Sequence, residues 1–129
     1  MIPETFYDLL DGPVVVMLAT VMPDGQPQVT PVWCSRHGGQ IWVNSAVGRQ
    51  KDQNMRARPQ VTIAALDPQN PYRYIEIRGR VVELVEGPAA HDHIEALAQQ
   101  YFGRSFNYNT PDEKRCIYKI EPTRVRTSA

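Results

Sequence analysis

The stretch that decides the fold runs from Val14 to Arg36 and reads VVVMLATVMPDGQPQVTPVWCSR. Its first part, Val14 to Met22, is rich in β-branched residues, which favour an extended strand. Pro23-Asp24-Gly25 follows as a strong turn signal. Gln28 to Arg36 then predicts a second strand. Because the connection is so short, we expect the two strands to form an antiparallel hairpin.

Outside this hairpin, glycines and prolines separate further segments that alternate between extended and helical patterns. A change in the apolar phase near Gly79 predicts a bulge or a barrel corner. Further strands are expected over Gln40 to Ser45, Gln60 to Asp67, Tyr72 to Glu86 and Lys114 to Glu121, with a short extension around Val125. Helices are expected over Glu4 to Leu10, Gln50 to Arg58, and from Pro88 to a closing Gly103. Strands dominate over three modest helices, which predicts a mainly β protein built as a six-stranded antiparallel barrel.

Length and charge narrow the classes of protein that this chain can belong to. With 129 residues, it is expected to form a single domain over residues 1–129. Fourteen Lys plus Arg balance fourteen Asp plus Glu, and this neutrality argues against a nucleic-acid or membrane-surface partner. Met1 to Gly12 lacks the features of a signal peptide, so we expect a cytoplasmic protein. Cys34 and Cys116 form no C-x-x-C motif and are expected to be reduced thiols.

One segment carries a pattern typical of ligand binding. Asn44 to Met55 reads NSAVGRQKDQNM, which leaves a predicted strand through small residues and enters a predicted helix. Backbone N–H groups at a helix N-terminus attract anions, and Arg49 and Lys51 add positive charge there. The segment matches neither a Walker loop nor G-x-G-x-x-G. Its spacing alone is therefore consistent with a phosphate site or with an ordinary solvated helix face.

The order of segments resembles the split β-barrel flavin and deazaflavin oxidoreductases of the pyridoxamine 5'-phosphate oxidase class. The similar stretches cover nearly the whole chain. They are Leu18-Ala-Thr with Pro-Asp-Gly-Gln-Pro-Gln beyond it, Pro31-Val-Trp33, Ile41-Trp-Val-Asn-Ser45 running into Gly48-Arg-Gln-Lys51 and Asn54-Met-Arg, and Ile77-Arg-Gly-Arg-Val-Val82. Ala96 to Arg104 and Ile120 to Val125 are similar to the branch that uses the deazaflavin coenzyme F-420.

The resemblance implies a set of cofactor-binding positions. Arg49 and Lys51 match the positions that grip phosphate. Gly48 and Gln50 line the turn, Asn44 and Ser45 border the cofactor tail, and Asn54 belongs to the same motif. The strand from Gln28 to Trp33, with Thr30, Pro31 and Val32, matches the segment that runs along the cofactor ring. The family works as a homodimer with the ring between subunits, so residues of the partner chain would complete the site.

The implied activity is hydride transfer between reduced F-420 and a small unsaturated or conjugated organic substrate. Flavin mononucleotide (FMN) oxidases of the class tend to place an Arg directly before the Lys, whereas here Gln50 precedes Lys51. This departure favours F-420, with FMN as the alternative cofactor. A non-catalytic module that binds a flavin or haem is the alternative from another functional class. The proton donor could be Tyr101, Tyr108 or solvent, and no catalytic residue is singled out.

The histidines are the remaining candidates for chemistry. His91 and His93 lie two positions apart on a predicted helix, so they point in different directions and cannot share one metal ion. We therefore expect no metal site. No local motif supports Cys34 or a serine as a nucleophile.

Overall fold

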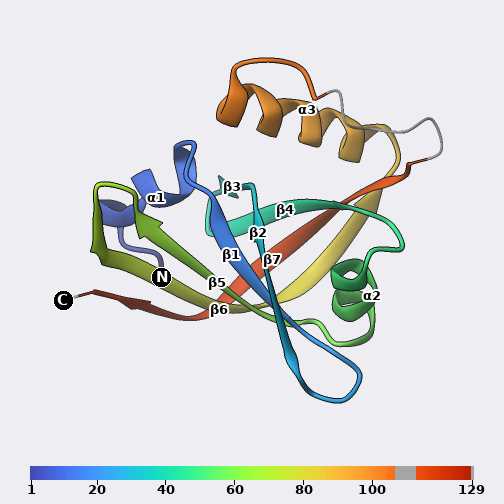
Figure 1. Ribbon diagram of the computed structural model, residues 1–129, viewed down its shortest axis with the longest axis horizontal. Helices are drawn as coiled ribbons and strands as arrows, with labels where there is room; N and C mark the ends of the chain where they lie inside the picture. The colour runs from blue at the N-terminus through green and yellow to red at the C-terminus, as the bar shows by residue number, and fades with distance from the viewer. Residues whose placement is uncertain (107–112, 129) are drawn as a thin grey trace.

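The computed structural model describes residues 1–106 and 113–128, which form one curled antiparallel sheet with helices around it (Figure 1). The order of strands across the sheet is β2-β1-β5-β6-β7-β4-β3. The strands are β1(Val16–Val21), β2(Pro27–Val32), β3(Cys34–His37), β4(Gln40–Ala46), β5(Gln60–Asp67), β6(Asn70–Glu86) and β7(Arg115–Thr127). The predicted mainly β architecture is confirmed.

The number of strands differs from the prediction, because the segment Gln28–Arg36 is two strands and not one. β2 pairs with β1 as far as Val32, and β3 then pairs with β4 from Cys34 onward. Only Trp33 separates the two strands, although they form opposite edges of the sheet. Residues on both sides of Trp33 are extended, so the sequence pattern carried no sign of the change of partner. The described residues therefore contain seven strands.

The helices lie close to their predicted positions. The N-terminal segment is a 3-10 turn, η1(Glu4–Phe6), followed by the short α1(Asp8–Asp11). The other two helices are α2(Gln50–Ala57) and α3(Pro88–Phe102). Pro88 stands in the first turn of α3, and Gly103 ends the helix with a left-handed backbone at φ 71°. No helix in the described residues is long and apolar enough to cross a membrane.

The main core lies inside the curl of the sheet, where alternate side chains of the strands meet. Ile63, Ile75, Ile77 and Ile120 are fully buried there, together with Tyr118. The predicted irregularity near Gly79 is present, since the register of β6 against β7 shifts between Arg78 and Gly79. A Cβ atom at Gly79 would lie 2.6 Å from the Glu121 carbonyl oxygen. Only glycine allows the two strands to approach this closely.

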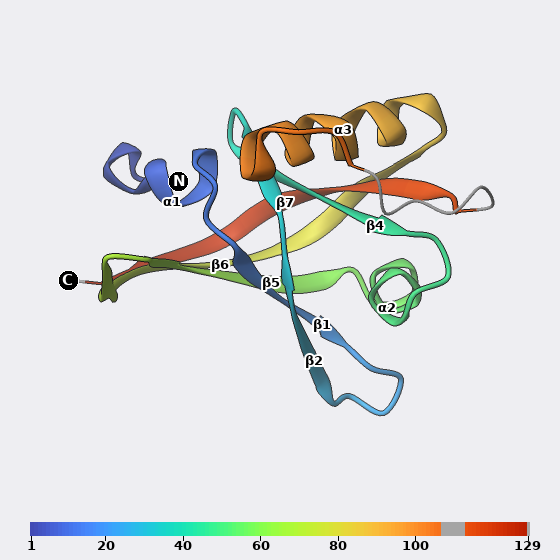
Figure 2. The ribbon, with the colours of Figure 1, turned by 45° about the horizontal axis from the view of Figure 1, so that its top comes forward.

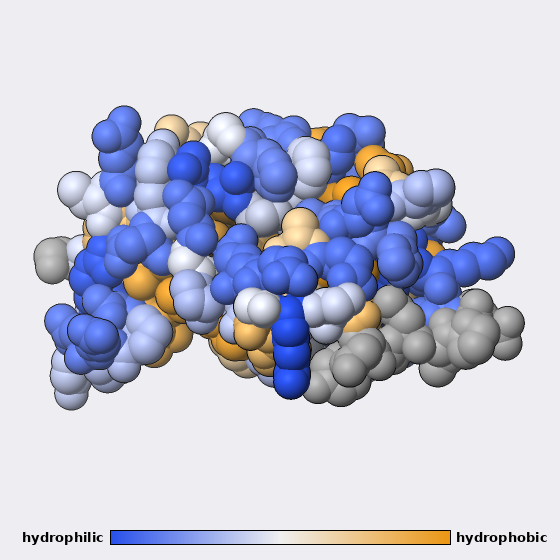
Figure 3. Space-filling model, turned by 90° about the horizontal axis from the view of Figure 1, so that it is seen from above, coloured by the Kyte–Doolittle hydropathy of each residue, from blue (hydrophilic) through white to orange (hydrophobic). Residues whose placement is uncertain are grey.

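α3 lies across the sheet on the side away from this core and contacts β7, β6 and β4 (Figures 1 and 2). Its apolar stripe, with Ile94, Leu97 and Ala98, is buried. Viewed from the α3 side, the surface is mostly hydrophilic, with apolar side chains showing between the polar ridges (Figure 3). α2 follows β4 and lies at the end of that strand (Figure 2). This arrangement leaves a hollow between α3, the start of α2 and the β1–β2 edge.

Candidate functional site

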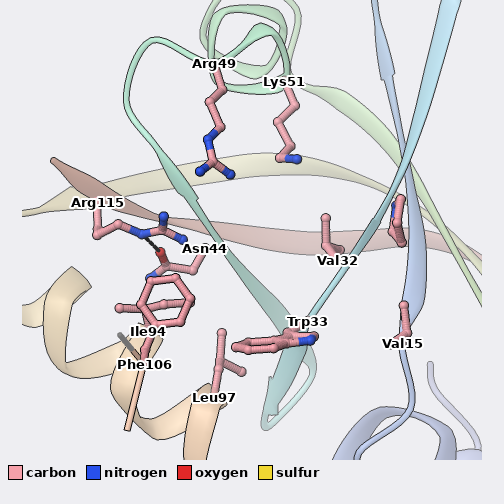
Figure 4. A pocket seen from close by; sticks show the side chains of 11 residues that line it. Val15, Val32, Trp33, Asn44, Arg49, Lys51, Ile94, Leu97, Phe106 and Arg115 are labelled. Carbon is pink, nitrogen blue, oxygen red and sulfur yellow. Dashed lines mark hydrogen bonds between the residues drawn. The ribbon is translucent and has the colours of Figure 1, made fainter. Parts of the chain in front are cut away.

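The hollow is a cavity of about 310 Å³ with a cationic end and an apolar end (Figure 4). The loop into α2 and the start of β7 supply the cations, while the β1–β2 edge and α3 supply the apolar side chains. The polar lining residues are Asn44, Arg49, Lys51 and Arg115. The apolar lining residues are Val15, Pro31, Val32, Trp33, Ile94, Leu97 and Phe106.

Positive charge exceeds negative charge at the cationic end. Arg49, Lys51 and Arg115 face the cavity, and Glu113 is the carboxylate beside them. Arg49 contacts Glu113 at 3.2 Å, and the nearest Arg115 nitrogen lies 3.5 Å from the other carboxylate oxygen. Burial, together with the positive charges of Arg49 and Arg115, lowers the pKa of the Lys51 ammonium. An anionic ligand would relieve this repulsion.

Arg115 is the most deeply buried of the three cations, with 6% of its side chain exposed. Burial lowers the pKa of its guanidinium, although the Glu113 carboxylate acts in the opposite direction. Arg115 Nε donates a hydrogen bond of 2.9 Å to Asn44 Oδ1. Arg115 Nη1 and Glu113 Oε2 are buried and form no hydrogen bond with any described residue. These two atoms lie 3.5 Å apart as an ion pair, so an anion entering the cavity would compete with Glu113 for the guanidinium.

The apolar end is built around Trp33. The Trp33 ring stacks on Tyr101 with 5.1 Å between centroids and 14° between planes. Phe102 meets it edge-on at 4.8 Å. In Figure 4 the ring lies across the cavity from Arg49 and Lys51. A ligand that fills the cavity therefore meets a flat aromatic and aliphatic wall at one end and cations at the other.

The loop that carries Arg49 and Lys51 is fixed by a buried carboxylate in α2. Asp52, 2% exposed, accepts hydrogen bonds from the Gly48 N–H at 2.9 Å, from Arg56 Nε at 2.8 Å and from the Tyr118 hydroxyl. Burial raises the pKa of this carboxyl, but the three donors outweigh burial and hold the pKa below its usual value. Arg56 also pairs with Glu86 at 2.9 Å. The start of α2 is thereby connected to β6 and β7.

Six of the twelve predicted cofactor-binding residues line the cavity and six do not. Those that line it are Pro31, Val32, Trp33, Asn44, Arg49 and Lys51. Of the others, Thr30 lies next to the site, since Lys51 Nζ is 3.4 Å from Thr30 Oγ1. Asn54 accepts a hydrogen bond from Gln50 Nε2 and donates to Gln28 Oε1, and its Nδ2 also donates to Thr20 Oγ1 at 3.0 Å. Ser45 is buried with its hydroxyl unpaired among the described residues.

Two backbone N–H groups just before α2 are bonded within the chain. The backbone N–H of Gly48 is not free for an anion, because it donates to Asp52 Oδ2. The Arg49 N–H donates to the Ala46 carbonyl at 3.3 Å. The side chains of Arg49 and Lys51, rather than these backbone groups, supply the positive charge that faces the cavity.

Tyr101 is placed as a structural residue. Its hydroxyl donates to the Val14 carbonyl at 2.8 Å and accepts from the Cys34 N–H at 3.1 Å. Burial raises the pKa of this phenol, so the group is a poor proton donor. Its hydroxyl hydrogen is also already donated to the Val14 carbonyl. Tyr108, the other predicted candidate, lies outside the described residues.

Sequence reasoning missed Arg115, Val15 and the lining residues of α3. Arg115 is the first residue of β7 and pairs with Ala46, which lies two residues after Asn44 on β4. The sequence placed a strand there, but it gave no information on which strand would lie beside it. In the described residues no group of three or more His, Cys, Asp and Glu side chains could hold a metal ion. Cys34 and Cys116 are free and buried, as expected.

Comparison with known proteins assigns the chain to a family. Among solved structures, an F-420 reductase is 35% identical, with a TM-score of 0.86 and coverage of 97% of this chain and 98% of that one. A conserved hypothetical protein from Mycobacterium tuberculosis is 26% identical, with a TM-score of 0.78 and coverage of 99% and 85%. HupZ from Group A Streptococcus, 22% identical with a TM-score of 0.71 and coverage of 98% and 99%, shares the fold. A comparison with curated proteins found no match. Residues 2–129 match the pyridoxamine 5'-phosphate oxidase family, and the chain belongs to that family.

Proposed function

We propose that this protein is an F-420-dependent oxidoreductase that transfers a hydride between the reduced cofactor and a small unsaturated or conjugated organic substrate. The observation that carries the proposal is the division of the cavity. Three cations stand at one end, with Glu113 as the one carboxylate that pairs with them among the described residues, and Trp33 and aliphatic side chains form the other end. A cofactor with a planar ring and a phosphate-bearing tail has this same division of chemistry.

The residues present fit such a group. Arg49, Lys51 and Arg115 would hold the anionic tail, with Arg115 exchanging its ion pair with Glu113 for the ligand. Val32, Trp33 and Leu97 would border the ring. The bound deazaflavin supplies the hydride, so the protein does not need an acid–base pair of its own for that step.

The chain's own contribution is binding, orientation and exclusion of water. Arg49 and Lys51 lie across the cavity from Trp33, so their binding energy would fix the position of the ring without touching the reacting atoms. Trp33 cannot swing away easily, because Tyr101 and Phe102 pack against it. The aliphatic side chains around it keep water from the reacting end.

Two observations favour F-420 over FMN. The F-420 reductase is 35% identical to this chain over almost its full length. In addition, Gln50 stands at the position where FMN oxidases of this class tend to have an Arg. Its side chain bonds to Asn54 and does not line the cavity. FMN remains the alternative cofactor for the same site.

We also propose that the working unit is a homodimer in which the partner covers the open side of this cavity. β2 is an edge strand, and Val29 on it is 54% exposed. Val15, which lines the cavity, is 52% exposed. Exposed apolar side chains beside a ligand cavity are typical of a surface that another chain covers. Sedimentation equilibrium should show a dimer at micromolar concentration, and a monomer would contradict this part of the proposal.

Fluorescence titration with F-420 and with FMN tests the assignment. We expect F-420 to bind, and Arg49→Ala combined with Lys51→Ala to weaken its affinity by about a hundredfold, because two charge-assisted contacts are lost. The matched control is Arg80→Ala with Arg124→Ala, which removes two exposed cations away from the cavity and should leave the affinity unchanged.

Turnover is tested with reduced F-420 and a panel of conjugated carbonyl and quinone acceptors. Substrate-dependent oxidation of the cofactor supports the proposal. Binding of FMN alone would replace the cofactor assignment, and binding of haem or a flavin without turnover would favour the non-catalytic module. If neither F-420 nor FMN binds, the proposed function is wrong.

A further inference from the structure

A chain of hydrogen-bonded side chains leads from the cationic end of the cavity through the protein to a second cavity. It begins with Arg115 and Asn44, continues through His93 and Ser35, and ends at His37. The second cavity, about 410 Å³, is lined by Ser35, His37 and His93 among others. His93 is the centre of the chain, and the proposed function gives this buried histidine no role.

The Arg115 end of the chain determines which atoms donate. Arginine has no acceptor, so Arg115 Nε must donate to Asn44 Oδ1. The Asn44 amide nitrogen therefore faces the other way, where it donates to the Ala90 carbonyl at 2.9 Å and to His93 Nδ1 at 3.1 Å. His93 Nδ1 must carry no proton, which leaves Nε2–H to donate to Ser35 Oγ at 2.9 Å. The Ser35 hydroxyl then donates to His37 Nε2 at 2.8 Å.

The surroundings of His93 keep its imidazole neutral. The ring is 8% exposed, and burial, the nearby His37 and Arg115 lower its pKa to about 4. The other charges on this side are Lys119, which lies over the Trp42 ring, and Arg36, which is paired with Asp11. His37 stacks on Trp42 at 3.6 Å, and burial, Lys119 and Arg36 also lower its pKa. A second proton on His93 would place an N–H donor against the Asn44 amide donor.

We propose that His93 is a positioning residue for the ligand site: its neutral, Nε2-protonated ring fixes the Asn44 amide, which in turn holds the Arg115 guanidinium toward the cavity. The inference rests on the proposed binding of an anionic cofactor tail at that end. Without His93 Nδ1, the Asn44 amide nitrogen keeps the Ala90 carbonyl as its one acceptor among the described residues, so the amide is held less firmly against turning over. A turned amide presents its nitrogen to Arg115 Nε, and the guanidinium loses its acceptor.

Two substitutions of His93 separate this role from simple packing. An Asn side chain places its amide oxygen near the position of the Nδ1 atom, whereas a Gln side chain reaches the position of Nε2. His93→Asn thus keeps an acceptor for Asn44, and His93→Gln keeps the contact with Ser35 but loses that acceptor. Helix propensity favours Gln over Asn, so weaker binding by the Gln variant cannot come from a weaker α3.

The first measurement needs no cofactor. In the ¹⁵N-labelled protein we expect His93 to show the neutral Nε2–H tautomer between pH 5 and pH 8, and Arg115 Nε–H to give a slowly exchanging signal. The Arg115 signal should persist in His93→Asn and be lost in His93→Gln. A protonated Nδ1 in the native protein, or the same Arg115 signal in both variants, would overturn the inference.

The second measurement is the affinity for F-420 at pH 7. We expect His93→Gln to bind about tenfold more weakly than the native protein, and His93→Asn to bind within about twofold of it. Ser35→Ala, which removes only the far contact of the ring, should behave like the native protein. Equal affinities of the Gln and Asn variants would count against the inference. If the native protein binds no F-420, the proposed function fails, and the Arg115 signal still decides whether His93 positions it.

Discussion

The helix α2 carries two groups of charged side chains that differ in how completely they are paired. On one face, Asp52 is bonded to Arg56, Tyr118 and the Gly48 N–H, and Arg56 continues to Glu86. We call this group the Asp52 cluster. At the start of the same helix, Arg49 and Lys51 join Arg115 around the cavity, with Glu113 as the carboxylate beside them. We call these three cations the cavity cations.

The difference separates charges that serve the fold from charges that, under the proposed function, serve a ligand. The Asp52 cluster meets its hydrogen-bonding needs within the chain, and the net effect on the pKa of Asp52 favours its charged form. Burial and the nearby charges of Arg49 and Arg115 lower the pKa of Lys51, so the surroundings of the cavity cations disfavour its charged form. Charges held together against their own repulsion need an anion from outside. Removing a charge from the Asp52 cluster should therefore destabilise the folded protein. Removing one of the cavity cations should stabilise it slightly, because repulsion is reduced.

The largest effect is expected for Asp52→Ala. The substitution leaves the Tyr118 hydroxyl and the Gly48 N–H without their acceptor and removes one of the partners of Arg56. We expect a loss of about 4 kcal/mol in the free energy of unfolding, the range for breaking a buried pair. Urea denaturation followed by circular dichroism measures it. Asp92→Ala, at an exposed position of α3, is the matched control and should change little.

Acid should weaken the protein in two separate steps. The pKa of His93 is lowered from 6.5 to about 4, so the unfolded chain binds a proton more readily than the folded one. Stability is then complete above about pH 6.5 and falls by about 3 kcal/mol as the pH drops to about 4. The pKa of Asp52 is also lowered, so its contribution is lost only below its usual value of 3.8.

The variant His93→Asn separates these two steps. Because Asn does not titrate, the loss between pH 6.5 and pH 4 should shrink to the part that His37 contributes. The loss below that range, which belongs to Asp52, should remain. Unfolding by urea at a series of pH values gives both. An unchanged slope between pH 6.5 and pH 4 would show that His93 is not the group responsible.

A smaller loss is expected for Tyr118→Phe, which removes one of the three donors to Asp52 and leaves the ring in the core. We expect about 1 to 2 kcal/mol, since the carboxylate keeps Arg56 and the Gly48 N–H. The pKa of Asp52 should rise, moving the second acid step to higher pH. A stability equal to that of the native protein would show that Arg56 and the Gly48 N–H suffice to hold Asp52.

The smallest change in stability, and one of opposite sign, is expected for Lys51→Met. The side chain loses a charge that burial, Arg49 and Arg115 disfavour, while its aliphatic stem is kept. Because the group is partly exposed, we expect a gain of at most about 0.5 kcal/mol without ligand. Affinity for F-420 should fall by about tenfold. A loss of stability similar to that of Asp52→Ala would mean that the cavity cations serve the fold.

The sequence predicted local features well because short-range chemistry determines them. The turn at Pro23-Asp24-Gly25, the start of α3 at Pro88 and the irregularity at Gly79 each depend on neighbouring residues. Arg49 and Lys51 were found because they adjoin a recognisable strand-to-helix turn. These features needed no knowledge of which strands lie side by side.

What the sequence could not predict depends on contacts between distant segments. Arg115 reaches the cavity because β7 pairs with β4, and His93 becomes important because Asn44 lies 49 positions away from it. Asp52 looked like one anion within a basic helix, whereas its partners Tyr118 and Arg56 make it a buried anchor. Likewise, the extended pattern on both sides of Trp33 concealed a change of pairing partner.

The single residue between β2 and β3 has a consequence for how this chain can change in length. Trp33 is the only residue between the two edge strands β2 and β3, so the connection cannot change in length without moving one of them. An added residue there would shift the register of one edge strand and turn its inward side chains outward. The loop between β1 and β2 carries no such restriction and can accept insertions. Relatives of this protein should therefore differ in length at the hairpin and share one length at Trp33.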